Sequence, residues 1–138
     1  MIQRQQTLWL LLSAISCILS FSYPFYAGTI LVNNIVTADK LHAGSNFFLA
    51  VLTGASILLS LCTIFLFKNR KLQLRLCFTG IAISVVTLVI YFAEMKAFAS
   101  GSISLSCLFA FANVIGYVMA ARGVWKDEKL VKSLDKLR

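Results

Sequence analysis

The sequence has little charge, and long parts of it have none. Charged residues make up 13% of the chain, which is about half the share of a soluble domain. Each uncharged stretch contains about 17–21 strongly apolar residues, enough for a helix to cross roughly 30 Å of hydrocarbon. This pattern argues against a soluble globular domain and predicts four membrane-spanning helices. The uncharged stretches lie between Arg4 and Asp39, Lys40 and Lys68, Arg75 and Glu94, and Lys96 and Arg122.

Other scarcities narrow the class of protein further. One proline and seven glycines argue against a fibrous or disordered chain. His42 is the only histidine, so a histidine-based metal site is excluded. The motifs HExxH and GxSxG and a P-loop are missing, and we expect no enzyme activity and no cofactor. The cysteines lack paired spacing and are predicted to be small apolar packing residues rather than a disulfide framework or a zinc site; they are Cys17, Cys62, Cys77 and Cys107.

The basic residues are divided unequally between the predicted loops. Only Lys40 and Lys96 fall in the first and third loops, where Asp39 and Glu94 balance them. The other eleven of the 13 basic residues lie at the two ends and in the second loop. Short loops rich in Lys and Arg stay cytoplasmic, so we expect both termini inside. Attraction to anionic inner-leaflet lipid accounts for the net charge of +8 more simply than nucleic acid binding does.

The four spans are expected at about residues 7–23, 46–67, 76–93 and 103–121. Pro24 ends the first span, since proline disfavours helix at the residue before it. Ser45 or Asn46 is available to cap the second span, and Ser100 or Ser102 the fourth. The fold class is therefore an all-α membrane protein, an antiparallel four-helix bundle over residues 1–124 with a basic tail over residues 125–138.

The first span also invites comparison with a processed signal segment. Residues 14–17, Ala-Ile-Ser-Cys, faintly resemble a lipoprotein processing site. We expect no cleavage, because the apolar run continues past Cys17 through Phe21. Cleavage would leave three spans.

The loop between the first two spans carries two β-favouring runs. Residues 29–32 and 35–37 flank Asn33 and Asn34, and asparagine tolerates positive φ. A short β-hairpin is one prediction for this loop, and an apolar loop on the membrane surface is the alternative.

The tail is predicted to form a basic amphipathic helix on the cytoplasmic side. An apolar face recurs at helical spacing, formed by Leu130, Val131, Leu134 and Leu137, and the lysines on the opposite side are Lys129, Lys132 and Lys136. Glu128 and Lys132 form a favourable i,i+4 pair. We expect this helix to contact a partner protein or the inner leaflet, through the candidate residues Trp125, Lys126, Lys129, Leu130, Leu134 and Leu137.

Each predicted span also has a stripe of small or polar residues on one face. Such stripes either pack helices against each other, as in the small-residue ridge Ala112, Gly116 and Ala120, or line a polar cavity for a small molecule, ion or lipid headgroup. Glu94 is either an interfacial anchor, reaching water or Lys96, or a proton or cation site. Asn113, in the middle of the fourth span, forms either an interhelical hydrogen bond or part of that cavity. The candidate polar site is Glu94, Asn113, Ser84, Thr87 and Tyr91.

The two ends of the chain carry a family resemblance. The start MIQR and QTL, the turn PFY, and the closing segments ARGV, KDEKLV and SLDKLR resemble an uncharacterised family of four-span inner-membrane proteins of Bacteroidota, domain of unknown function 4293. The resemblance implies four spans and a bacterial inner-membrane location, and it brings no activity, cofactor or catalytic residue.

Two functions follow from these patterns. The first is a non-enzymatic membrane scaffold or accessory subunit that acts through its tail. The alternative is binding or transport of a small molecule, ion or lipid through the polar faces. The expected partners are the lipid bilayer and another protein at the tail, with no nucleic acid.

Overall fold

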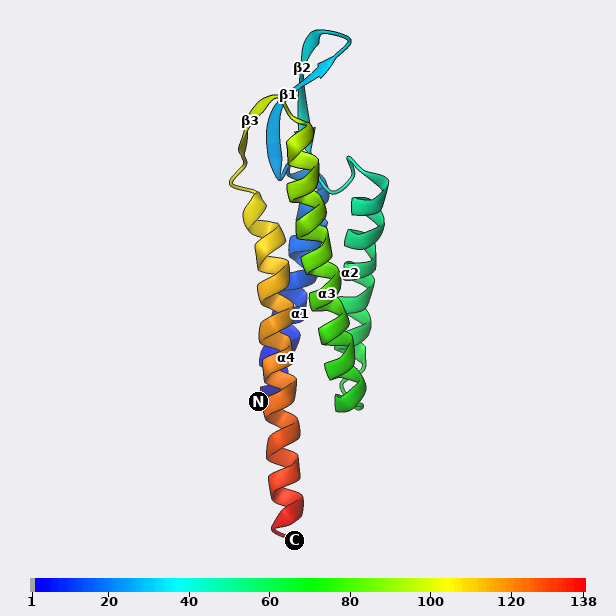
Figure 1. Ribbon diagram of the computed structural model, residues 1–138. Helices are drawn as coiled ribbons and strands as arrows, with labels where there is room; N and C mark the ends of the chain where they lie inside the picture. The colour runs from blue at the N-terminus through cyan, green and yellow to red at the C-terminus, as the bar shows by residue number, and fades with distance from the viewer. Residues whose placement is uncertain (1) are drawn as a thin grey trace.

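A computed structural model describes residues 2–138 as an antiparallel bundle of four helices with a small sheet at one end (Figure 1). All four helices are long and apolar enough to cross a membrane. The N- and C-termini lie at the same end of the bundle, opposite the sheet (Figure 1). The helices are α1 (Ile2–Ser22), α2 (Phe47–Phe65), α3 (Arg70–Glu94) and α4 (Cys107–Lys136).

The bundle has polar residues inside and apolar residues outside. Ser13, Ser60 and Thr63 are fully buried, whereas Leu58 on α2 and Leu108 on α4 are more than 60% exposed. A water-soluble bundle arranges its side chains the other way round. Polar stripes of the four helices therefore meet on the bundle axis.

Small residues bring α4 close to α1. A Cβ atom added to Gly116 would lie 2.8 Å from the backbone oxygen of Trp9 and 3.0 Å from Cβ of Ser13. Ala120, one turn further along the same ridge, is fully buried. The predicted ridge of Ala112, Gly116 and Ala120 is therefore a helix-packing surface at these two positions, where only a small side chain allows the approach.

The predicted β-hairpin is confirmed. Strands β1 (Tyr26–Val32) and β2 (Ile35–Leu41) pair antiparallel, with Val32 opposite Ile35. Asn33 and Asn34 both adopt positive φ, 51° and 61°. Two such residues form a type I′ turn, whose twist matches that of the strands.

The start of the fourth helix differs from the prediction. Residues 100–103 form a third strand, β3 (Ser100–Ile103), which pairs with β1, and α4 begins only at Cys107. Ser100 and Ser102 as helix caps, and a span starting at residue 103, were therefore wrong. Gly28 faces Gly101 across this pair, and a Cβ on Gly28 would lie 2.3 Å from the Ser100 oxygen. The strand depends on a partner about 75 residues away in the chain, which local sequence patterns do not reveal.

The remaining helix boundaries follow or extend the expected ones. Asn46 caps α2, since its side-chain oxygen accepts a hydrogen bond from the Phe48 amide at 3.0 Å. Helix α3 starts at Arg70 rather than residue 76, because Arg, Lys, Leu and Gln are good helix formers. Helix α4 passes without a break from the fourth span into the predicted tail helix.

An aromatic cluster seats the sheet on the helices. Phe25, just before β1, stacks on Tyr91 of α3, with ring centroids 4.4 Å apart. Leu41 of β2 and Leu49 of α2 are buried in the same cluster. A 3-10 helix, Met95–Ala97, then leads from α3 toward β3. The cluster therefore closes the sheet end of the bundle.

The close α1–α4 contact generates a prediction. Gly116→Ala places a methyl group against the backbone oxygen of Trp9, and we expect it to lower the free energy of unfolding by about 1–3 kcal/mol. The matched control is Gly54→Ala on α2, where an added Cβ meets no atom within 4 Å. We expect the control to be neutral or to stabilise by up to about 1 kcal/mol. Thermal unfolding of both variants in detergent measures the difference, and equal effects would contradict the close packing.

Candidate functional site

Asn113 joins all four helices at the middle of the bundle. Its side-chain carbonyl accepts a hydrogen bond from the Ser13 hydroxyl of α1. Its amide donates to Ser84 of α3 at 3.1 Å and to Ser56 of α2 at 3.3 Å. One side chain of α4 thus has partners on each of the other three helices. The structure shows the predicted interhelical hydrogen bond of Asn113, and Asn113 also borders a small cavity.

The neighbouring hydroxyl groups are also satisfied inside the protein. The Tyr117 hydroxyl donates to the backbone oxygen of Ser56 at 2.6 Å. Ser84 and Thr87 each donate to the carbonyl one turn earlier on α3, at 2.7 and 2.8 Å. These bonds leave few donors free to hold a ligand.

Thr53 of α2 is the exception. It is 4% exposed, and its hydroxyl has no hydrogen-bond partner among residues 2–138. It borders a small cavity of about 10 Å³, which has room for about one water molecule. The cavity is lined by Cys17, Ser20, Thr53, Ser84, Thr87, Leu88, Tyr91, Ala110 and Asn113.

Four of the five candidate polar-site residues therefore come together, and Glu94 does not. Ser84, Thr87, Tyr91 and Asn113 line the small cavity. Glu94 lies half-buried at the end of α3, where its carboxylate accepts a hydrogen bond from the Asn46 amide at 2.7 Å. In the described chain it forms no ion pair with Lys96. This hydrogen bond holds the ends of α2 and α3 together. Thr53, which lines the cavity with an unpartnered hydroxyl, was not among the predicted site residues.

The candidate tail residues lie on a part of α4 that extends past the other helices (Figure 1). We call residues 125–136 the projecting segment. Leu134 and Leu137 are 65% and 84% exposed, and Leu130 is also exposed. The predicted pair is confirmed, with 3.0 Å between Lys132 Nζ and Glu128 Oε1. The exposed candidates are Trp125, Lys126, Lys129, Leu130 and Leu134 on α4, and Leu137, the residue that caps its end.

A hydrogen bond fixes the base of the projecting segment. The amide of Gln6 on α1 donates to the carboxylate of Asp127 at 2.8 Å. Gln6 is 3% exposed and packs where a Cβ on Gly123 would lie 2.7 Å from its side chain. The two residues are 121 positions apart, and each lies in one of the end segments that carry the family resemblance, QTL and KDEKLV.

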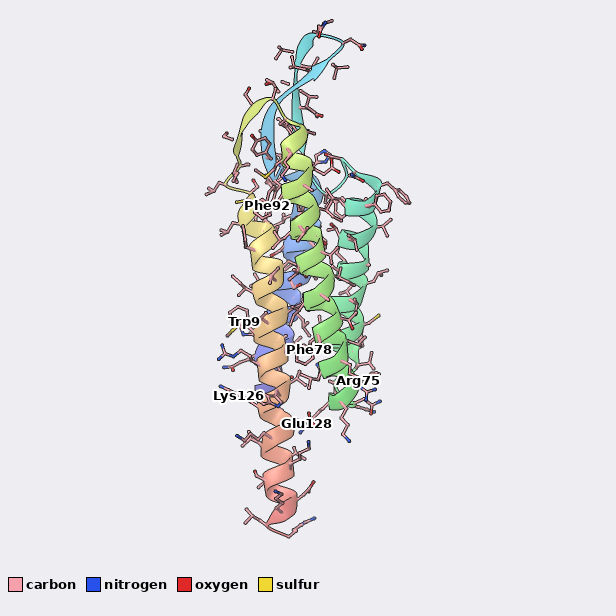
Figure 2. The ribbon with its side chains drawn as sticks, viewed as in Figure 1. Trp9, Arg75, Phe78, Phe92, Lys126 and Glu128 are labelled. Carbon is pink, nitrogen blue, oxygen red and sulfur yellow. The ribbon has the colours of Figure 1, made fainter. Side chains whose placement is uncertain are left out.

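An open groove of about 760 Å³ lies between the projecting segment and the start of α3. Arg75 and Glu128 lie near it on its two sides (Figure 2). The sequence shows a basic loop here but not the groove, because the opposite wall comes from α4. Its lining consists of Lys68, Asn69, Arg70, Lys71, Leu72, Arg75, Glu128, Val131, Lys132 and Asp135.

The described residues contain no cluster of side chains suited to bind a metal ion. Within them, no three His, Cys, Asp or Glu side chains come together to hold a metal ion. The four cysteines are unpaired, and Cys17 and Cys77 are buried. The site residues therefore offer hydrogen-bonding groups on the axis and charged and apolar groups at the end that carries the termini.

Comparison with known proteins identifies one family. The profile of a family described as a domain of unknown function (DUF4293) matches residues 2–137. The resemblance drawn from the two ends of the sequence is therefore confirmed for the family. Neither the curated proteins nor the solved structures contain a match to this chain.

The Asn113 bonds generate a prediction. Asn113→Leu leaves the hydroxyls of Ser13, Ser56 and Ser84 with fewer partners, and we expect the free energy of unfolding to fall by about 1–3 kcal/mol. Thr79→Val is the matched control, because that exposed hydroxyl bonds only to the Arg75 carbonyl of its own helix. We expect the control to change stability by less than about 0.5 kcal/mol. Unfolding in detergent measures both, and an unaffected Asn113→Leu variant would show that the bonds do not hold the bundle.

Proposed function

The chain belongs to the DUF4293 family, and from its geometry we propose that it is a non-enzymatic scaffold or accessory subunit of the bacterial inner membrane. The bundle is its membrane anchor. The projecting segment is a docking helix for a partner protein on the cytoplasmic side. Exposed leucines on that segment carry the proposal.

The membrane placement is supported by the distribution of side chains. Exposed apolar residues surround the four helices, while the buried positions include many hydroxyl groups. Helices in lipid associate through small residues and polar contacts, since no hydrophobic force acts between them there. The end with the termini and the α2–α3 turn carries eleven of the 13 basic residues, which favours a cytoplasmic position for both termini.

The closed axis supports a scaffold rather than a transporter or an enzyme. The cavity beside Thr53 has about 10 Å³, too little for any solute larger than water. Asn113 and its neighbours are occupied by one another. Glu94, the acid that a proton or cation pathway would need, bonds to Asn46 at the end of the bundle instead.

The direction of α4 favours a protein partner over the lipid surface. The helix has 30 residues, about 45 Å at about 1.5 Å per residue, against roughly 30 Å of hydrocarbon. It continues in line with the bundle rather than bending away from it (Figure 1). Leu130, Leu134 and Leu137 therefore point sideways from a helix that leaves the membrane, and a hydrophobic groove on another protein would cover them.

The leucine face generates a prediction. In the Leu130→Ser, Leu134→Ser variant we expect a cross-linked partner in native membranes to decrease at least about tenfold, because buried apolar anchors dominate such interfaces. The control is Lys132→Ser, Lys136→Ser, two substitutions on the same segment outside the leucine face. Quantitative mass spectrometry of cross-linked material measures the partner. Retention of the same partner by the leucine variant would refute the docking role.

The proposed orientation generates a second prediction. A thiol introduced by Thr37→Cys on the hairpin should react with a membrane-impermeant maleimide in spheroplasts, since it faces the periplasm. A thiol introduced by Ser133→Cys should react only after the membrane is permeabilised. Both positions are exposed, and the chain without either substitution reports the reactivity of the native cysteines. The reverse labelling pattern would invert the topology.

A further inference from the structure

The groove between α3 and the projecting segment has a strongly basic wall. Lys68 and the first two turns of α3 supply four cations within eight residues, Lys68, Arg70, Lys71 and Arg75, all exposed. None of these four has a carboxylate partner in the described part of the chain. On the opposite wall, Lys132 is engaged by Glu128 at 3.0 Å, and Asp135 is the second acid. The groove therefore keeps an excess of positive charge that no internal acid neutralises.

The chemistry of that wall suits a phosphate group. Arginine presents a planar fork of donors that matches phosphate oxygens, and lysine adds a compact charge. Helix α3 begins here without an acid in its first turn, and its cap residue Asn69 makes no side-chain cap bond. Its first backbone amides add to the positive field. These groups lie on the α3 side of the groove.

The groove also offers apolar surface beside the charges. Leu72 on α3 and Val131 on α4 line it and are 42% and 40% exposed. A free phosphate ion has no apolar part to contact these side chains. A phospholipid does, because its glycerol and the start of its acyl chains lie next to its phosphate. The volume of about 760 Å³ lies in the range of small-ligand sites.

We propose that this groove binds the phosphate headgroup of an anionic phospholipid of the inner leaflet. The inference rests on the proposed cytoplasmic position of this end. The lipid bridges the cations of α3 to the projecting segment and holds that segment in place beside the bundle. At about 100° per residue, the groove residues Glu128 and Lys132 lie about 120–160° around α4 from Leu130 and Leu134, with Val131 between the two sides. A partner protein on the leucines therefore leaves the charged part of the groove open to the lipid.

The experiment measures lipid retained by the full chain. The protein is reconstituted in vesicles with equal amounts of phosphatidylglycerol and phosphatidylcholine and extracted in mild detergent, and bound lipid is counted by native mass spectrometry. One charge beside an anionic surface changes binding by about fivefold. We therefore expect Arg70→Gln, Lys71→Gln, Arg75→Gln to lower retained phosphatidylglycerol at least about tenfold, with phosphatidylcholine unchanged.

The matched control removes the same number of charges outside the groove. Arg122→Gln, Lys136→Gln, Arg138→Gln, three exposed cations that do not line the groove, should retain phosphatidylglycerol as the unsubstituted chain does. Equal losses in the two triple variants, or no loss in the groove variant, would overturn the proposal in favour of general attraction. Displacement of phosphatidylglycerol by an excess of inorganic phosphate, with no preference between the two lipids, would also overturn it and leave a free-anion site.

Two checks keep the result interpretable. Thermal unfolding shows whether the groove variant folds, and Arg75→Gln alone, with an expected loss of about fivefold, replaces it if it does not. The amount of lipid retained by the extracted protein does not depend on which side of the membrane the groove faces, or on whether the leucines bind a partner. Failure of the maleimide labelling or of the partner cross-link would therefore refute the proposed function while the lipid count still decides the groove.

Discussion

The hydrogen bonds of Asn113 are the interaction on which the bundle depends. All four helices are long and apolar enough to cross a membrane, and in the proposed lipid surroundings no hydrophobic force acts between them, so close packing and polar contacts must hold them together. Asn113 supplies a contact to each of the other three helices, through Ser13, Ser56 and Ser84. Gly116 and Gly80 provide the close approach, since a Cβ at Gly80 would lie 2.3 Å from the Tyr117 ring. Polar bonding and small size thus act at the same level of the bundle.

The hydrogen bonds among the polar groups of the axis also determine which parts of the protein remain free to bind a ligand or partner. An axis whose hydroxyls and amide bond to one another or to backbone carbonyls has little left for a ligand. Among the described residues, the Thr53 hydroxyl is the buried side-chain polar group without a partner, and it borders a space of water size. The unpartnered surfaces lie at the end with the termini, where the projecting segment exposes leucines on one side and borders a basic groove on the other. The surfaces available to a partner are therefore concentrated at this end of the bundle. The hydrogen bond between Gln6 and Asp127 connects the projecting segment to helix α1.

The sequence predicted the elements whose signals are local. Four uncharged stretches indicated four helices, and Asn33-Asn34 between two β-favouring runs indicated the hairpin. The polar stripes of the third and fourth spans indicated residues that do meet on the axis, Ser84, Thr87 and Tyr91 from one and Asn113 from the other. Glu94 does not lie with these residues, because it is at the end of α3, where its carboxylate accepts a hydrogen bond from Asn46, the cap residue of α2. Strand β3 was missed because a short Ser- and Gly-containing segment becomes a strand only when β1 lies beside it.

The sequence by itself determined the helices, their number, the polar face of each and the end at which positive charge accumulates, because hydropathy, periodicity and charge are properties of neighbouring residues. Only the tertiary structure decided which polar groups satisfy one another, that the axis is closed, and that α4 runs unbroken beyond the bundle to form a groove with α3. Those outcomes depend on distances between residues up to 121 positions apart. Such distances follow from how the helices pack, which no single segment encodes.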